Sequence, residues 1–597
     1  MVTKATRSPR RRTVVALAVV LAVLAGFIVR LVDIQVVNAG EHIAQSMDHA
    51  FGGSQTLYGT RGMIVDQTGQ TLAGSILEYD CQLDPLLITQ IDQDLANGKK
   101  ASMKEPWSAV SVEVAALTGQ TVEEVQAVVG DALADDPASR YAILKRGLST
   151  EVYRDLAEIG APYLVCVQHP ARTYPDGAVA GNLVGFMGTD GEPLEGIEMA
   201  EDSCLAATNG LLDYQKGKDG VVIPGTKREQ PATDGGTLEL TINRDLQWYL
   251  QQLIGEQAQD MGAKSGAIMV VEVKTGKIRA AAEWPSVDPN DVDASLPADR
   301  SSRIFRESFE PGSTFKALTA ATVIDAGGQT PLSTVVASSY ETFSNGARVK
   351  DAFNHPAYTY TLAGVLIDSS NAGISRFSER VDAQTRSEYL KKFGIAQGSA
   401  IGFPFEVKGD IHPVEEWDNQ TLYNTAYGQG LTATMPELAG AYGAIANDGV
   451  RMPLSLIESC TEADGSVVTP KQPEPVRVVR PETAAEVRQI LENVALQANY
   501  SKAIEIPGYR LAVKTGTGEK ADLVNGGYKA GVYFTTMAGF APAEDPEYLV
   551  VVTLDEPLKV RSSGANATAF QKAMTQVLKT YRVMPSTTAP ELLPKFG

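Results

Sequence analysis

The chain has 597 residues, of which 44% are hydrophobic and 21% are charged, and it carries a formal net charge of −20 at pH 7. A chain of this length exceeds what one hydrophobic core usually serves, so two or more domains are expected. So acidic a surface repels phosphate, which argues against nucleic acid as a partner.

The first residues predict a membrane anchor. A basic segment, residues 1–12, precedes the uncharged stretch Thr13 to Val29, which at roughly 17 residues reaches the lower limit for a membrane-spanning helix. Apolar residues after Arg30 extend this span to residues 13–35 if the arginine side chain reaches the membrane surface. The nearest small-residue cleavage site, at residues 37–39, lies too far beyond the apolar run for a signal peptide. We therefore expect a single-pass protein of the cytoplasmic membrane, with a cytoplasmic N-terminus and an extracytoplasmic body.

The cysteines and histidines predict neither a disulfide scaffold nor a metal site. The four cysteines, Cys81, Cys166, Cys204 and Cys460, are few and scattered. The exported side would permit one bridge among the first three, and isolated buried thiols are an equal alternative. The five histidines show no ligand spacing, so no metal is expected.

The pattern of expected elements changes near residue 236. Residues 36–235 mix short strands, turns and helices, including a helix over residues 121–133 capped by Thr121, and no motif there predicts chemistry. A spacer or interaction module is the simplest interpretation. In residues 236–583, strand patterns at both ends enclose a helical middle, which predicts an α+β domain with an antiparallel sheet. The tail, residues 584–597, is expected to be loose.

The tripeptide Lys-Thr-Gly occurs twice, at residues 274–276 and 514–516. Two apolar runs flank the first copy, and its glycine occupies a turn position that favours a positive φ. This pattern predicts a β-hairpin and needs no further role. The second copy lies on a late strand and has to be judged with the motifs that precede it.

A serine and a lysine at helical spacing form the first of these motifs. Ser313 follows Pro311 and Gly312 at the start of a helical pattern, and Lys316 lies one turn further on the same face. A neutral lysine amine there can take the serine proton and so activate a weak nucleophile. Such a pair alone is expected by chance in a chain of this size, and a solvated surface pair would be the simpler interpretation.

Two further motifs follow in order. Ser369, Ser370 and Asn371 form an S-x-N sequence, and the second Lys-Thr-Gly is extended by Thr517. S-x-x-K, S-x-N and K-T-G in this order resemble the active-site motifs of penicillin-binding proteins and β-lactamases. The second Lys-Thr-Gly is therefore the functional copy.

The likeness extends over nearly the whole chain, which is identified as a member of the class B penicillin-binding proteins. It includes the stretches "RGMIVDQTGQTLA", "RTYPDGAVAGNLVGFMG" and "YGQGLTATMPELAGAYGAIANDG". The resemblance implies a membrane-anchored D,D-transpeptidase, with an elongated pedestal at residues 36–235 and a transpeptidase domain at residues 236–583. Departures such as Gln67, where an arginine is usual, lie outside the three motifs.

The resemblance also implies roles for the motif residues. Ser313 is expected to attack the penultimate D-Ala carbonyl of a peptidoglycan stem peptide, with Lys316 as general base. Ser369 is expected to relay a proton to the leaving amine, helped by Lys316 and Lys514. Asn371 is expected to hydrogen-bond the substrate amide.

The strand of the second Lys-Thr-Gly is expected to bind the substrate. The resemblance assigns the terminal carboxylate to Thr515, Gly516 and Thr517, with positive charge from Lys514. Backbone N–H groups of Ser313 and Thr517 would form the oxyanion hole. The peptide can add to the edge of this strand. No metal or organic cofactor is implied.

The partners implied are peptidoglycan stem peptides, β-lactams as covalent inhibitors, a polytopic glycosyltransferase and divisome membrane proteins. The stretch from Tyr427 to Gly449 favours a septal role in cell division over a role in elongation. A β-lactamase shares the motifs but lacks a pedestal. A β-lactam sensor needs a sizeable cytoplasmic effector, for which residues 1–12 are too short.

Overall fold

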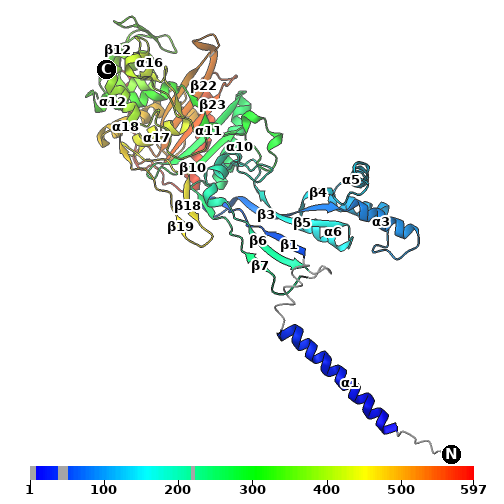
Figure 1. Cartoon of the computed structure of the whole chain (residues 1–597). Coiled ribbons are helices and arrows are strands. Elements are labelled where there is room, and N and C mark those ends of the chain that lie inside the picture. The colour runs from blue at the N-terminus through cyan, green and yellow to red at the C-terminus, as the bar shows by residue number, and fades with distance from the viewer. Residues whose placement is uncertain (1–8, 38–50, 217–221, 523) are drawn as a thin grey trace, which may run out of the picture. The chain divides into compact units, whose positions relative to one another are not determined.

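The computed structural model describes residues 9–37, 51–216, 222–522 and 524–597 (Figure 1). The chain divides into two compact units. One consists of residues 1–60 and 207–234, and the other of residues 61–206 and 235–597.

The first unit contains the expected apolar helix and a small sheet. Helix α1 (Pro9–Val32) continues into a π-helical turn (Asp33–Val37). Within α1, residues 13–32 are long and apolar enough to cross a membrane. The sheet has the order β1-β6-β7 and is antiparallel, with β1 (Phe51–Leu57), β6 (Gly210–Lys216) and β7 (Arg228–Gln230).

In the second unit, residues 61–206 contribute a sheet with helices on it. The long strand β3 (Thr71–Leu83) lies between β4 (Ala142–Ser149) and β5 (Leu164–Thr173). Apolar side chains of this sheet share a core with α3 (Pro85–Ala96), α4 (Trp107–Thr118), α5 (Val122–Asp135) and α6 (Thr150–Glu158). The predicted cap of α5 is confirmed, because Thr121 and Glu124 form a reciprocal capping box.

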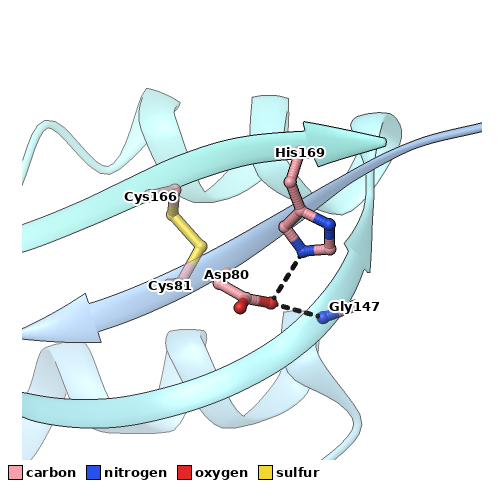
Figure 2. The surroundings of a disulfide bond; sticks show 5 residues. All are labelled: Asp80, Cys81, Gly147, Cys166 and His169. Atoms are coloured by element: carbon pink, nitrogen blue, oxygen red, sulfur yellow. Dashed lines mark hydrogen bonds and ion pairs between the residues drawn. A yellow bond between two sulfur atoms is a disulfide. The ribbon is translucent and has the colours of Figure 1, made fainter. Parts of the chain in front are cut away.

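The structure corrects the expectation for the cysteines, because all four form disulfides. Cys81 pairs with Cys166, and Cys204 pairs with Cys460. The first bridge forms because β3 and β5 place Cys81 directly opposite Cys166. Figure 2 shows this bridge beside Asp80, whose carboxylate accepts hydrogen bonds from His169 and from the Gly147 N–H.

The second bridge joins residues that the sequence keeps far apart. The Gly236 N–H donates to the Cys204 carbonyl at 2.7 Å, and strand β8 (Thr237–Leu240) follows directly. β8 pairs with β18 (Ile457–Thr461), which brings Cys460 to this point. The alternative of one bridge among the first three cysteines is confirmed by Cys81–Cys166. The alternative of isolated thiols was wrong, and the second bridge, to Cys460, was not expected.

Strand pairing also connects residues 61–206 to the remainder of the second unit. β2 (Ile64–Val65) pairs in parallel with β8 in a sheet of order β19-β18-β8-β2-β3-β4, and β19 spans Val467–Val468. Beside this sheet, the fully buried Glu198 accepts hydrogen bonds from Arg61 and Arg172. The smaller helices here are α7 (Gly181–Val184), α8 (Gly196–Ala200) and α9 (Asp202–Leu205).

The expected antiparallel sheet forms from both ends of the larger domain. Its order is β10-β9-β23-β22-β21, with β9 (Ser265–Glu272), β10 (Ile278–Trp284), β21 (Ala512–Ala521), β22 (Tyr528–Ala541) and β23 (Tyr548–Asp555). α10 (Arg244–Met261) and α20 (Ala567–Thr580) pack on this sheet and on each other (Figure 1). The predicted α+β fold class is confirmed.

The segment between β10 and β21 contains helices and loops, as expected, with short strands among them. Its helices are α11 (Arg303–Arg306), α12 (Lys316–Asp325), α13 (Leu362–Ile367), α14 (Asn371–Ser378), α15 (Ala383–Lys392), α16 (Thr421–Asn424), α17 (Met435–Ala446), α18 (Pro481–Gln497) and α19 (Ser501–Ile504). Short antiparallel pairs join β11 (Ser308–Phe309) to β16 (Ala433–Thr434), β12 (Thr334–Ala337) to β15 (Tyr358–Thr361), β13 (Tyr340–Thr342) to β14 (Arg348–Lys350), and β17 (Val450–Arg451) to β20 (Val476–Arg477).

The tail differs from the loose segment that the sequence suggested. Ser586 accepts a hydrogen bond from the Arg510 N–H at 3.0 Å, and the buried Leu593 donates its N–H to Asn493 at 2.8 Å. Its apolar residues follow no helical or strand period, so the sequence gives no local signal for this packing.

Candidate active site

Ser313 and Lys316 meet at the point where a tight turn becomes a helix. A 3₁₀ turn (Gly312–Phe315) contains Ser313 and runs directly into α12, whose first residue is Lys316. The Nζ of Lys316 lies 3.0 Å from the Oγ of Ser313. The predicted one-turn proximity is present, although the turn is tighter than an α-helix.

The Lys316 amine is fully buried. Burial, together with the positive charge of Lys514, holds the pKa of Lys316 well below its usual range, and Asp351 opposes this shift. Desolvation disfavours the charged ammonium, so the neutral amine has a lone pair available for a proton. The arrangement meets the requirement for a base beside a nucleophilic hydroxyl.

Ser369 brings the second motif to the same amine. The Oγ of Ser369 lies 3.2 Å from the Nζ of Lys316 and 3.0 Å from the Nζ of Lys514, and Lys316 also donates to the Ser369 carbonyl. Ser369 has a φ of 57°, a left-handed value that is uncommon for residues other than glycine. This backbone conformation follows the end of α13 and turns the chain toward α14.

Lys514 comes from β21, the edge strand of the five-stranded sheet. Its side chain is 1% exposed, and burial lowers its pKa to about 7. Gly516 lies against the turn before Ser313, because a Cβ at this position would stand 2.3 Å from the Pro311 carbonyl oxygen. Only glycine permits so close an approach of the two backbones.

The other predicted residues lie on the same elements with contacts of their own. Asn371 begins α14 and donates its side-chain amide to the Lys350 carbonyl at 3.0 Å. The Thr515 hydroxyl lies 3.5 Å from the hydroxyl of the partly buried Tyr500. The Thr517 hydroxyl accepts from the Ser563 N–H at 3.2 Å. These hydroxyls and this amide are therefore positioned by neighbours that the motifs do not include.

Sequence reasoning missed a buried carboxylate behind the S-x-N loop. Asp351 accepts hydrogen bonds from the Ser370 hydroxyl at 2.7 Å, the Ala372 N–H at 2.9 Å and the His355 ring at 2.8 Å. It thus anchors the start of α14, where Asn371 lies. No motif marks Asp351, because its partners are brought together only by the fold.

The first Lys-Thr-Gly is the hairpin turn that was predicted. It connects β9 to β10, and Gly276 has a φ of 74°. The Thr275 hydroxyl donates to Glu272 at 3.0 Å, within the turn, and the Lys274 side chain is half exposed. In the described part of the chain, no group of three or more His, Cys, Asp and Glu side chains gathers at a spacing that could hold a metal ion.

Four side chains from three motifs therefore converge, with one buried amine between two hydroxyls. Two known protein families match the chain, and one of these matches includes all four residues. Residues 266–575 match the family described as the penicillin binding protein transpeptidase domain, and residues 56–240 match the penicillin-binding protein dimerisation domain. The chain belongs to the class B penicillin-binding proteins. The prediction of a transpeptidase is confirmed by this membership.

Relatives of this family resemble the chain over most of its length. Penicillin-binding protein PbpB of Mycolicibacterium smegmatis is 32% identical over 88% of this chain and 83% of the relative. PbpB of Mycobacterium tuberculosis is 33% identical over 85% of this chain and 75% of the relative. Peptidoglycan D,D-transpeptidase FtsI of Escherichia coli is 27% identical over 88% of this chain and 84% of the relative.

Solved structures agree with the fold. A peptidoglycan synthetase from Bifidobacterium adolescentis has a TM-score of 0.71 and 27% identity, covering 92% of this chain and 100% of that chain. Penicillin binding protein 3 of Mycobacterium tuberculosis complexed with aztreonam has a TM-score of 0.68 and 27% identity. The likeness covers 90% of this chain and 99% of that chain. Both likenesses include the pedestal and the catalytic domain, which supports one common architecture.

Proposed function

We propose that this penicillin-binding protein cross-links peptidoglycan stem peptides by acyl transfer through Ser313. The observation that carries the proposal is the buried Lys316 amine, which lies within hydrogen-bond distance of both the Ser313 and the Ser369 hydroxyls. A neutral amine in this position can activate one hydroxyl and pass the proton to the other.

In the first half-reaction, the Ser313 Oγ attacks the penultimate D-Ala carbonyl of a stem peptide. The hydroxyl proton passes to Lys316 as the Oγ–C bond forms. When the amide C–N bond breaks, a proton moves from Lys316 through the Ser369 hydroxyl to the departing nitrogen of the terminal D-Ala. The contacts of Ser369 with Lys316 and Lys514 support this relay.

In the second half-reaction, an amine from a neighbouring stem peptide attacks the acyl-enzyme. Lys316 takes the proton from this amine, directly or through Ser369, as the new C–N bond forms. The C–Oγ bond then breaks, and the proton returns to the Ser313 oxygen. Both halves use the same amine, which agrees with its position between the two hydroxyls.

Substrate binds along β21. Its free edge offers main-chain hydrogen bonds to an extended peptide. The substrate carboxylate binds at Thr515, Gly516 and Thr517. The positive charge of the neighbouring Lys514 attracts this carboxylate. The Asn371 amide pairs with the substrate backbone, and the N–H groups of Ser313 and Thr517 stabilise the oxyanion.

β-Lactams acylate Ser313 in the same way. Support comes from Mycobacterium tuberculosis penicillin binding protein 3, of which structures complexed with aztreonam and with ampicillin are known. In a β-lactam the broken C–N bond belongs to a ring, so the leaving nitrogen stays attached and blocks the acceptor amine. The adduct is therefore expected to persist.

The wider setting follows from the anchor and the relatives. With α1 as the membrane span, residues 1–12 lie in the cytoplasm and the catalytic domain lies outside the cytoplasmic membrane. The basic residues that precede the span support this orientation. The matches at residues 56–240 and 266–575 support a pedestal at 36–235 and a catalytic domain at 236–583. The likeness to the relatives named FtsI and PbpB supports a septal role. A polytopic glycosyltransferase and divisome membrane proteins are the partners that the family resemblance implies.

The test is labelling of the full chain in detergent with a fluorescent penicillin, followed by peptide mass mapping. The adduct is expected on Ser313, and Ser313→Ala is expected to remove it. An adduct on another residue, or labelling that survives this substitution, contradicts the proposal. For the septal role, depletion is expected to give filamentous cells, whereas rounded or bulging cells would favour elongation.

A further inference from the structure

Residues 591–597, here called the strap, run from α18 to the start of α13. Asn493 on α18 donates to the Glu591 carbonyl at 2.9 Å and accepts from the Leu593 N–H at 2.8 Å. Gln497, one turn further along α18, donates to the Leu593 carbonyl at 2.9 Å. The first part of the strap is thus fixed by two side-chain amides of one helix.

The next part of the strap holds the residue that begins α13. Thr361 is the N-cap of α13, and its hydroxyl accepts from the Gly364 N–H while donating to the Pro594 carbonyl at 2.7 Å. The Thr361 N–H donates to the Lys595 carbonyl at 3.0 Å. A Cβ on Gly364 would lie 1.9 Å from that carbonyl oxygen, so the close approach needs glycine.

The Lys595 side chain reaches the other end of the same helix. Its Nζ lies 2.6 Å from the Asp368 carboxylate, with side-chain exposures of 29% for Lys595 and 18% for Asp368. Asp368 directly follows α13, and its N–H donates to the Gly364 carbonyl at 2.9 Å. The strap therefore contacts the residue before α13 and the residue after it.

An aromatic contact strengthens this connection. Phe596 pairs with Tyr360 in an antiparallel bridge, and its ring packs against those of Tyr358 and Tyr360. The Tyr360 hydroxyl donates to the second carboxylate oxygen of Asp368 at 3.3 Å. Both oxygens of Asp368 are thus held by groups that belong to the strap or pack against it.

Ser369 comes directly after Asp368. Its left-handed φ of 57° is intrinsically unfavourable for serine, so contacts on either side have to maintain it. On the side-chain side, Lys316 and Lys514 hold the Ser369 hydroxyl. On the backbone side, the contact of Lys595 with Asp368 holds the preceding residue. A change of a few tenths of an ångström here alters the shared hydrogen bonds between the hydroxyl and the two amines.

We propose that the strap positions Ser369 for proton transfer, with Lys595 as a positioning residue that acts through Asp368. The inference rests on the proposed role of Ser369 in the acyl-transfer reaction. It predicts that loss of the Lys595 contact slows the chemical step of acylation and leaves the binding of the β-lactam before that step unchanged.

The decisive experiment compares the full chain in detergent with its Lys595→Met, Lys595→Arg and Lys572→Met variants, using a fluorescent penicillin. Lys572 is an exposed lysine of α20, outside the strap and the three motifs, and serves as the control. Lys595→Met is expected to lower the saturating acylation rate constant about three- to thirtyfold, because small misplacements of catalytic groups reduce rates strongly. The penicillin concentration at half-saturation should not change.

Lys595→Arg keeps the charge and is expected to restore most of the rate, and Lys572→Met should react as the natural chain does. Equal rate constants for the natural chain and Lys595→Met would overturn the proposal. So would a loss in Lys595→Met that appears only in the half-saturation concentration.

Hydrogen exchange provides a readout that does not depend on catalysis. Deletion of residues 591–597 is expected to speed exchange at the amides of Asp368, Ser369 and Ser370, while amides in β3 and β5 keep their rates. Unchanged exchange rates at the amides of Asp368, Ser369 and Ser370 would overturn the proposal that the strap positions Ser369. If the natural chain were not acylated at Ser313, the proposed function would fail, and exchange would still decide whether the strap holds this loop.

Discussion

The Nζ of Lys514 and the Nζ of Lys316 approach the same oxygen, the Oγ of Ser369, at 3.0 Å and 3.2 Å. Both amines are buried, and the pKa of each lies below its usual range mainly because of burial. Two ammonium groups so placed would repel each other in a medium that screens charge weakly. The site therefore favours one neutral and one charged amine, which are the states that a base and a carboxylate-binding group require.

The two Lys-Thr-Gly sequences give a matched pair of variants. Lys514→Ala is expected to lower the second-order rate constant for acylation by about 100-fold or more, because it removes a charged group from the reacting site. Lys274→Ala changes a half-exposed turn residue and should leave this rate constant unchanged. Acylation by a fluorescent penicillin measures both. Equal losses would mean that the first copy also belongs to the site.

The pH dependence of acylation should be bell-shaped. The proposed base is the neutral Lys316 amine, so the rate is expected to fall at low pH as this amine gains a proton. Lys514, whose pKa is lowered to about 7, loses its positive charge as the pH rises through that value, and its attraction for the β-lactam carboxylate is lost with it. We therefore expect the second-order rate constant to decline above about pH 7.

A methyl ester of the same β-lactam provides the control for this profile. Since the ester has no carboxylate, its rate constant should be lower and should not decline above neutral pH. A rate constant for the free acid that keeps rising from pH 6 to pH 9 would show that the charge of Lys514 contributes nothing to binding.

The sequence allowed the three motifs to be proposed because their spacing is local or their order is specific. Ser313 and Lys316 are one helical turn apart, so their proximity depends only on a short segment. S-x-N and K-T-G could be assigned because the order of the three motifs is specific. The hairpin at Lys274 followed from the glycine and the flanking strands alone.

The parts that could not be predicted depend on long-range packing. Four cysteines allow three pairings, and only the alignment of β3 with β5 and of β8 with β18 selects the observed one. Asp351 and Lys595 act on Ser369 or its neighbours through the fold, and neither lies in a recognisable motif. The tail residue Leu593 is buried by α18, which no periodic pattern in residues 584–597 indicates.

Glu198 is expected to be important for stability. It is fully buried and receives the Nε–H groups of Arg61 at 2.8 Å and Arg172 at 2.6 Å. Glu198→Gln removes the negative charge and leaves two buried guanidinium groups without it, so we expect a loss of about 3 to 5 kcal/mol in the free energy of unfolding. Thermal and denaturant unfolding of the full chain would measure the change.

Asp202 supplies the control for that experiment. It binds Arg61 at 2.6 Å, but its side chain is 43% exposed. Asp202→Asn is therefore expected to cost less than about 1 kcal/mol, since exposed ion pairs contribute little. Equal effects of the two substitutions would contradict the importance assigned to burial of Glu198.

The Cys204–Cys460 bridge joins positions separated by 256 residues and connects the end of the segment 61–206 to the catalytic domain. A crosslink that closes so long a loop removes much conformational freedom from the unfolded chain, and such bridges typically add about 2 to 5 kcal/mol to the free energy of unfolding.

The Cys204→Ser/Cys460→Ser double variant should therefore unfold at a lower temperature than the natural chain in oxidising buffer. Because both proteins lack this bridge under strong reduction, the difference should shrink when reductant is added. Acylation of Ser313 in the folded variant should keep its rate, since Cys204 lies on α9 and Cys460 on β18, outside the elements that carry the motifs. A difference in melting temperature that persists undiminished in full reductant would show that the serine substitutions, rather than the bridge, cause the loss.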